Sequence, residues 1–241
     1  MVWHVADNGE RTEMPSTYDG RDVRVTVGHF SNYVIAYDES RAAECPKDST
    51  CPISKFSDAA ATAWYHDGVH YVLENGLMQG VEDNLFEPYS STTRAMMAQI
   101  LFNMEGRPST DHEPDYTDVY SGMWYTEAVR WASSEDIMEG YGGGLFGPDD
   151  EMTREQLVTI VYRYAGYKGV DVSELSDFTG YTDVNKIGGW ALNGMRWAVG
   201  CGAVTGRTET TLNPQDTANR AEIATIIMRY CENIAGENIA S

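Results

Sequence analysis

Positive charge is scarce in this chain. Its 241 residues include 17 lysines and arginines against 37 aspartates and glutamates, which gives a formal net charge of −20 at pH 7. Proteins that bind nucleic acids neutralise phosphates with basic patches. The composition therefore argues against nucleic acid as a partner, and an acidic exterior favours solubility.

Long apolar stretches are also missing. No run of about 18 apolar residues occurs, so the sequence predicts no transmembrane helix and no membrane insertion. The first residues, MVWHVADNGE, lack the basic and apolar regions of a signal peptide. Two interpretations stay open at this point: the protein is cytosolic, or this chain is the tail of a longer precursor.

Cysteine is rare as well, with four copies. Cys45 and Cys51 lie in the polar, proline-flanked stretch ECPKDSTCP, within a predicted linker over residues 41–55. They could form a disulfide in an oxidising compartment or stay as thiols. Two cysteines without a second pair nearby make a poor zinc site, so we expect no metal here.

Threefold internal repetition is the main feature that the chain does have. In each copy an aromatic-x-Asp triplet comes first, and a tryptophan lies 30 residues before an arginine and seven before a second aromatic residue. A glycine lies 14 residues before each arginine and a proline six before it. The copies are Phe56 to Asp58, Trp64, Tyr71, Gly80, Pro88 and Arg94; Tyr116 to Asp118, Trp124, Trp131, Gly140, Pro148 and Arg154; Tyr181 to Asp183, Trp190, Trp197, Gly206, Pro214 and Arg220.

Each copy predicts a helix, a loop and a second helix. The first helix starts near the tryptophan and ends near a glycine, and the loop contains an apolar plug, Phe86, Phe146 or Leu212. The second helix has apolar residues at offsets 3, 6, 7 and 10 from its arginine, which form one face. We expect the tryptophans to anchor the core, with the alternative that an edge facing a groove stacks on a sugar. We expect the aspartates to cap helices or lock turns. A unit of about fifty residues cannot bury its apolar face alone, so the units must pack on each other.

This pattern predicts repeats at residues 56–107, 116–167 and 181–233. Ahead of them, RDVRVTVGHFSNYVIAY alternates apolar and polar residues on both sides of a GHFSN turn, which is the period of β-strands. Residues 1–40 therefore predict the last strands of a β module whose remainder lies upstream, because two or three strands alone are marginal in water. The alternating residues are Val23, Val25, Val27, Tyr33, Ile35 and Tyr37.

Each second helix begins with an arginine behind a capping residue. The helix dipole is positive there and disfavours a cation. A bound anion would remove the conflict, because unpaired helix N–H groups and the guanidinium fork both bind carboxylates. Alternatively, each arginine pairs with a local carboxylate, such as Asp149 or Asp150, and staples neighbouring units. The arginines are Arg94, Arg154 and Arg220, and the caps are Thr93, Thr153 and Asn219.

The stretch HDGVH, from His66 to His70, has the spacing of a zinc-protease motif. It has Asp67 where that motif needs glutamate, a helix-weakening Gly68, and no histidines at the same places in the other copies. We therefore expect surface histidines and no metal. The sequence has no GxSxG, no phosphate loop and no recurring pair of catalytic carboxylates, so it predicts no enzymatic activity and implies no cofactor.

The three copies closely resemble the S-layer homology (SLH) domains of Firmicutes-type bacterial surface proteins. The resemblance covers residues 56 to about 233 and rests on FSD…WY…GLMQG…LFEP…TTRA, YTDV…WY…DIMEG…LFGP…MTRE and YTDV…GW…GAVTG…LNP…ANRAE. It implies a mainly α fold in which three helix-loop-helix repeats pack as a pseudo-threefold bundle. It also implies an extracellular place, in the cell wall or S-layer, with a signal peptide upstream of this chain.

Such triplets are known as cell-wall anchors. The resemblance implies non-covalent binding, in grooves between repeats, to a peptidoglycan-linked secondary cell-wall polysaccharide that often bears pyruvate ketals. The alternative is a structural or protein–protein interaction module without glycan binding, and self-assembly stays open. The expected ligand-binding residues are the three arginines, their caps Thr93, Thr153 and Asn219, and Gly80, Gly140 and Gly206, which would let backbone approach the sugar.

The family's Thr-Arg-Ala-Glu motif is altered in this chain. The arginine is present in every copy, whereas the glutamate occurs once, as Glu222. The third copy also departs from the others around its tryptophan. We therefore expect unequal sites, with Arg220 contributing least to binding.

Overall fold

The structure of the protein is a computed structural model, and the chain divides between Pro46 and Lys47 into two units. The described residues are 2–5, 11–14, 16–18, 23–25, 32–35, 45, 47–113, 115–173 and 175–235.

The first unit contains short antiparallel strands in two groups. β1 lies between β2 and β5 in one sheet, while β3 pairs with β4 in the other. The strands expected on the two sides of the GHFSN turn are confirmed, but they pair with other strands and not with each other. Val27 and Tyr37 lie outside the described residues. The strands are β1 (Val2–Val5), β2 (Arg11–Met14), β3 (Ser16–Tyr18), β4 (Val23–Val25) and β5 (Asn32–Ile35).

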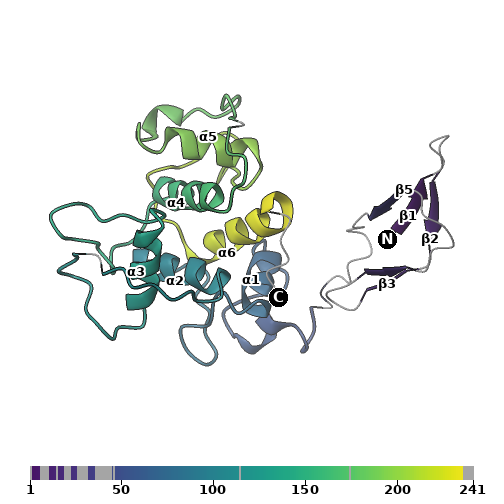
Figure 1. The fold of residues 1–241 in the computed structure, drawn as a ribbon, viewed down its shortest axis with the longest axis horizontal. Coiled ribbons are helices and arrows are strands. Elements are labelled where there is room, and N and C mark those ends of the chain that lie inside the picture. Colours follow the sequence, from purple (N-terminus) through teal and green to yellow (C-terminus); the bar gives the residue numbers. More distant parts are fainter. Residues whose placement is uncertain are drawn as a thin grey trace. The chain divides into compact units, whose positions relative to one another are not determined.

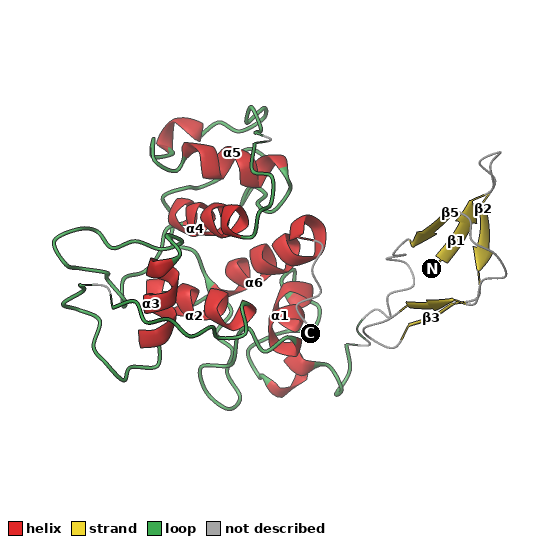
Figure 2. Ribbon diagram, viewed as in Figure 1, coloured by secondary structure: helices red, strands yellow, loops and turns green. Residues whose placement is uncertain are grey.

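The second unit is helical, and long loops join its helices (Figure 2). Each repeat contributes two α-helices, as the sequence predicts, so the mainly α fold is confirmed. The first helix of each repeat begins two residues after the repeat's tryptophan, and the second begins at its arginine. The α-helices are α1 (His66–Glu74), α2 (Arg94–Met104), α3 (Thr126–Ser134), α4 (Arg154–Tyr167), α5 (Leu192–Gly200) and α6 (Arg220–Arg229), with short helices η2 (Pro52–Lys55), η3 (Val184–Lys186) and η4 (Tyr230–Ala235).

The helices pack between repeats more than within them. The second helix of each repeat lies against the first helix of the next: α2 against α3, and α4 against α5. The last repeat returns to the first, because α6 packs on α1, as Figure 1 shows. This cyclic pairing is the pseudo-threefold bundle that the resemblance implies. It also buries the helix faces that a single repeat would expose.

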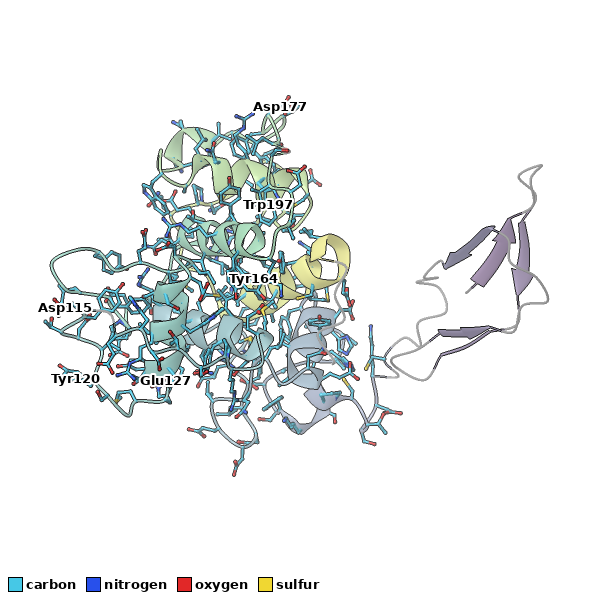
Figure 3. The ribbon with its side chains drawn as sticks, in the orientation of Figure 1. Asp115, Tyr120, Glu127, Tyr164, Asp177 and Trp197 are labelled. Atoms are coloured by element: carbon cyan, nitrogen blue, oxygen red, sulfur yellow. The ribbon has the colours of Figure 1, made fainter. Side chains whose placement is uncertain are left out.

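The core is built from the predicted apolar faces of α2, α4 and α6. Tyr164 lies near the middle of the unit (Figure 3), where its ring is 5.5 Å from that of Tyr230. Trp197 packs against Tyr162 at 5.7 Å between ring centroids, which joins α5 to α4. The predicted face is buried throughout, at Met97, Ile100, Leu101, Met104, Leu157, Ile160, Val161, Tyr164, Ile223, Ile226, Ile227 and Tyr230, and so are the plugs Phe86, Phe146 and Leu212.

The repeated tryptophans correct one expectation. Trp64, Trp124 and Trp190 were expected in the core, but they are 59%, 57% and 60% exposed. Each lies just before its helix begins, outside the turns whose apolar face points inward. The aromatic residues seven positions later, Tyr71, Trp131 and Trp197, fill the core instead. Three large apolar rings are therefore available on the surface.

The helices are all short. Among the described residues, none is both long enough and apolar enough to cross a membrane.

Candidate functional site

The second helices begin as the sequence predicts. Each capping side chain accepts a hydrogen bond from the backbone N–H three residues later. In α4 and α6 the third helical residue returns a bond to the cap, which completes a capping box with Gln156 or Glu222. The caps Thr93, Thr153 and Asn219 therefore have a structural function in setting where each arginine lies.

Each arginine reaches into the next repeat and binds two backbone carbonyl oxygens there. The Nε and Nη2 donors lie between 2.6 and 3.2 Å from these oxygens. The staple that the sequence offered as an alternative therefore exists, but carbonyls and not the suggested aspartate carboxylates accept these bonds. The bonds run from Arg94 to Phe146 and Glu139, from Arg154 to Leu212 and Thr205, and from Arg220 to Phe86 and Gln79.

The backbone N–H groups at these helix starts are not unpaired. The first N–H of each helix donates to a carbonyl of the neighbouring repeat, and the second donates to the carbonyl of that repeat's motif proline. The expectation of free N–H groups awaiting an anion is therefore wrong, because an adjacent chain segment supplies the acceptors. The pairs are Arg94 with Asp150, Arg154 with Asp216, Arg220 with Ser90, Ala95 with Pro148, Glu155 with Pro214, and Ala221 with Pro88.

These contacts explain how a cation is tolerated at a helix start. The three arginines are only 4–6% exposed, and burial lowers the pKa of each guanidinium. A guanidinium nevertheless stays charged in proteins. The carbonyl oxygens offset its charge, and aromatic faces help: the Arg94 guanidinium lies 4.5 Å from the Tyr141 ring centroid, and that of Arg220 lies 4.6 Å from Phe86.

The aspartates of the opening triplets lock the same loops. Each carboxylate accepts two backbone N–H bonds of 2.7–2.9 Å from the plug residue and the residue after it. The plug is thus held at its N–H by its own repeat and at its C=O by the arginine of the preceding repeat. The expected turn-locking function is confirmed for Asp58, Asp118 and Asp183.

The three motif glycines have an internal reason to lack a side chain. A Cβ on Gly80 would lie within 3 Å of the Phe56 ring and of two loop carbonyls. Gly140 and Gly206 have the same crowding against Tyr116 and Tyr181. Close packing of loop and aromatic ring therefore accounts for the glycines without a sugar.

The three arginines differ at their outer edge. Arg154 donates its Nη1 to Glu222 at 3.0 Å, and Glu222 also binds Arg207 at 2.7 and 2.9 Å. Burial alone would raise the pKa of Glu222, but the hydrogen bonds of Arg207 and the charge of Arg154 outweigh it and hold that pKa below its usual range. Among the described residues, neither Arg94 nor Arg220 has a carboxylate in a salt bridge.

A groove of about 390 Å³ opens beside the Arg154 staple. Sequence reasoning missed two of its cations, Arg207 and Arg229, because neither recurs in all three copies. Arg207 follows the motif glycine, where the other repeats have Val81 and Tyr141. The groove is lined by Trp64 from the first repeat, Arg154 from the second, and Gly206, Arg207, Glu222 and Arg229 from the third, among others.

Comparison with known families decides what this architecture is. The model of the S-layer homology domain matches at residues 55–98, 115–158 and 180–224. The chain belongs to the S-layer homology family. Its three SLH repeats are the three copies seen in the sequence, and each match begins one residue before the aromatic-x-Asp triplet.

Curated relatives of these SLH repeats are larger proteins. The exoglucanase XynX of Acetivibrio thermocellus is 27% identical over 70% of this chain and 16% of its own length. The surface-layer 125 kDa protein of Lysinibacillus sphaericus is 25% identical over 78% of the chain and 16% of its own length. The cellulosome-anchoring protein of A. thermocellus is 26% identical over 64% of the chain and 35% of its own length. The SLH region is therefore a part shared by proteins that otherwise differ.

Proposed function

We propose that the SLH repeats attach this protein non-covalently to the bacterial cell wall by binding a secondary cell-wall polysaccharide that bears pyruvate ketals. The observation that carries the proposal is the groove at Arg154. It combines three arginines with one glutamate on a chain whose net charge is −20. A local surplus of positive charge on so acidic a protein favours an acidic ligand.

The groove residues match the two parts of such a ligand. Trp64 presents an exposed ring on which a sugar face can stack. Arg229 provides N–H groups for the carboxylate of a ketal. Arg207 adds positive charge beside it, while most of its own N–H groups bind neighbouring carboxylates and a backbone carbonyl. Gly206 keeps the groove wall free of a side chain beside them.

The relatives support attachment at the cell surface. Their names include a surface-layer protein and a cellulosome-anchoring protein, besides enzymes such as an exoglucanase. A module shared by an enzyme and by surface proteins fits an anchor better than it fits a catalyst. In this proposal the SLH region has no enzymatic function, and its partner is the wall polysaccharide.

In this proposal most of the residues expected from the sequence position the groove and do not contact the ligand. Arg154 and Gly206 line the groove, while the caps set the helix starts. Repeat equivalence then proposes two further sites, so that one polymer binds at several points. They are the set Trp124, Arg220 and Gly80 and the set Trp190, Arg94 and Gly140.

One observation favours the structural alternative for the arginines themselves. Every one of the three is buried and bonded to the neighbouring repeat, which is sufficient reason for the motif without a ligand. Ligand binding must therefore be tested with groove residues whose loss leaves the staple intact.

The direct experiment is binding to purified cell-wall sacculi. Binding should be strong to untreated sacculi and should disappear after chemical removal of the polysaccharide. Mild acid, which hydrolyses ketals, should weaken it if pyruvate is recognised. Equal binding to stripped sacculi would favour the alternative of a protein–protein or structural module.

Two variants locate the site. Trp64→Ala removes an exposed ring, and Arg229→Ala removes a cation whose one hydrogen bond in the described structure is a 3.4 Å contact to Thr205. Each should weaken binding by about tenfold or more, the loss expected for one charge-assisted or stacking contact. Arg107→Ala is the control, since Arg107 is exposed, lies outside the groove and has no repeat position that lines it. Equal binding by all three variants would remove this groove from the proposal.

A further inference from the structure

Three side chains that the sequence treats separately meet at the start of the first repeat. Cys51 lies just before η2, and His66 and His70 lie one turn apart on α1, so their side chains share a helix face. The Cys51 Sγ is 3.5 Å from His66 Nε2 and 3.4 Å from His70 Nδ1. We call these residues the Cys–His cluster.

The cluster overturns the expected surface position of the histidines. His66 is 2% exposed and Cys51 is 3% exposed, while His70 is half-buried. The linker disulfide is not formed either, because Cys45 is not in a disulfide. The histidines and the linker cysteine belong to separate sequence patterns, and folding brings them to one place.

The distances fit a tetrahedral zinc ion. Zinc binds thiolate sulfur at about 2.3 Å and imidazole nitrogen at about 2.0–2.1 Å, so a tetrahedral angle places sulfur and nitrogen about 3.6 Å apart. The two sulfur–nitrogen separations here are 3.5 and 3.4 Å. A set of thiolate and imidazole donors at this spacing also selects zinc over the hard cations Mg²⁺ and Ca²⁺.

The outer ring nitrogens give an independent indication of a metal. His66 Nδ1 lies 2.7 Å from Asp67 Oδ1, and His70 Nε2 lies 3.3 Å from Glu74 Oε2. Each imidazole thus directs one nitrogen at Cys51 and the other at a carboxylate. Zinc-ligating histidines almost always have such a carboxylate or carbonyl on the other nitrogen, where it fixes the tautomer and ring orientation.

We propose that Cys51, His66 and His70 bind one zinc ion. Cys45 is the fourth ligand in this proposal, since six extended residues span up to about 20 Å and can bring its thiol to the same point. The ion would clamp Cys51 and η2 to α1. The clamp belongs to the first repeat alone, because the equivalent positions hold Thr126 and Arg130 in α3 and Leu192 and Arg196 in α5.

The test is zinc titration of the full chain. The protein is stripped with a chelator under reducing conditions and titrated with Zn²⁺ against a chromogenic chelator. One equivalent should bind tightly, and the melting temperature should rise with bound zinc. Co²⁺ in place of Zn²⁺ should give a thiolate-to-cobalt charge-transfer band that is absent in Cys51→Ser.

The zinc affinity of single variants distinguishes the zinc ligands from residues that do not bind the ion. Cys51→Ser and His70→Ala should each weaken binding at least 100-fold, and Cys45→Ser should weaken it as well. Asp67→Asn changes an exposed carboxylate and should weaken binding about tenfold through the orientation of His66. His112→Ala and Cys201→Ser are the controls, since both residues lie outside the cluster, and they should bind like wild type.

Two results would overturn the proposal. One is failure of the wild-type chain to bind a stoichiometric zinc ion. The other is equal affinity in Cys51→Ser, Asp67→Asn and wild type, which would assign the zinc to surface carboxylates. Unchanged affinity in Cys45→Ser alone would remove Cys45 as the fourth ligand.

Discussion

Equivalent arginines bridge the junction between repeats 2 and 3 and the junction between repeats 3 and 1, but their surroundings differ. They are Arg154 and Arg220. At both, the guanidinium binds two carbonyl oxygens of the next loop. At the first, Glu222 and Arg207 extend the contact into a charged network beside the groove. At the second, Arg220 binds carbonyls and the Phe86 ring and, among the described residues, forms no salt bridge. The shared part holds the repeats together, and the variable part decides what a ligand meets.

The largest effect should come from removing one side of both junctions. Deleting residues 181–241 removes α5 and α6, so α4 and α1 lose the helices that cover them. We expect the remaining two repeats to lose cooperative melting, because cores that are shared between repeats cannot be closed. Calorimetry of the truncated chain checks this, and an unchanged melting temperature would show that the repeats fold independently.

The next largest effect should come from removing one arginine that bridges two repeats. Arg154→Ala and Arg220→Ala each leave two buried carbonyls without their donor, at a cost of about 3 kcal/mol and a fall in melting temperature of about 6–12 °C. Lysine should rescue poorly, since it lacks the fork that reaches both oxygens. If both alanine variants melt like wild type, the arginine–carbonyl bonds do not hold the repeats together.

Acidic pH should destabilise the junction between repeats 2 and 3 more than the junction between repeats 3 and 1. The pKa of Glu222 is held below its ordinary value, so its stabilising contribution is complete above the usual glutamate range and is lost as the pH falls through the lowered pKa. Glu222→Gln should therefore flatten the fall in melting temperature on acidification. Glu209→Gln, an exposed carboxylate of the same repeat, is the control and should keep the wild-type slope.

The smallest expected effect comes from introducing a glutamate like Glu222 at the junction between repeats 1 and 2. Gln156 has the helix position of Glu222, and by repeat equivalence it faces Arg94 as Glu222 faces Arg154. Gln156→Glu should keep the capping box and add an ion pair, which stabilises the fold by up to about 1 kcal/mol. Denaturant unfolding measures it. A destabilised variant would show that the two junctions differ in more than this one residue.

Local features of this fold could be predicted from the sequence. The caps and the apolar spacing place the starts of α2, α4 and α6 correctly, because capping and periodicity depend on neighbours in the chain. The expected sites of Arg94, Arg154 and Arg220 in a first turn follow from the same signals. The turn-locking aspartates were also foreseen, although their partners 28 to 30 residues away were not.

The wrong expectations concern partners distant in sequence and the direction in which a side chain faces. The carbonyls that accept from the arginines belong to another repeat, so the first-turn position alone suggested an anion. Recurrence marked Trp64 as important without saying which way it faces. His66 was assigned to the surface because the linker that covers it lies outside the repeat pattern.

The return of α6 to α1 limits how many repeats the module can hold. In an open solenoid the terminal repeats expose a face, and a further copy can always stack on it. Here the last second helix already occupies the face of the first helix, so a fourth copy would find no surface to extend. The three repeats therefore close on themselves, and no helix face is left over for a fourth repeat to pack on.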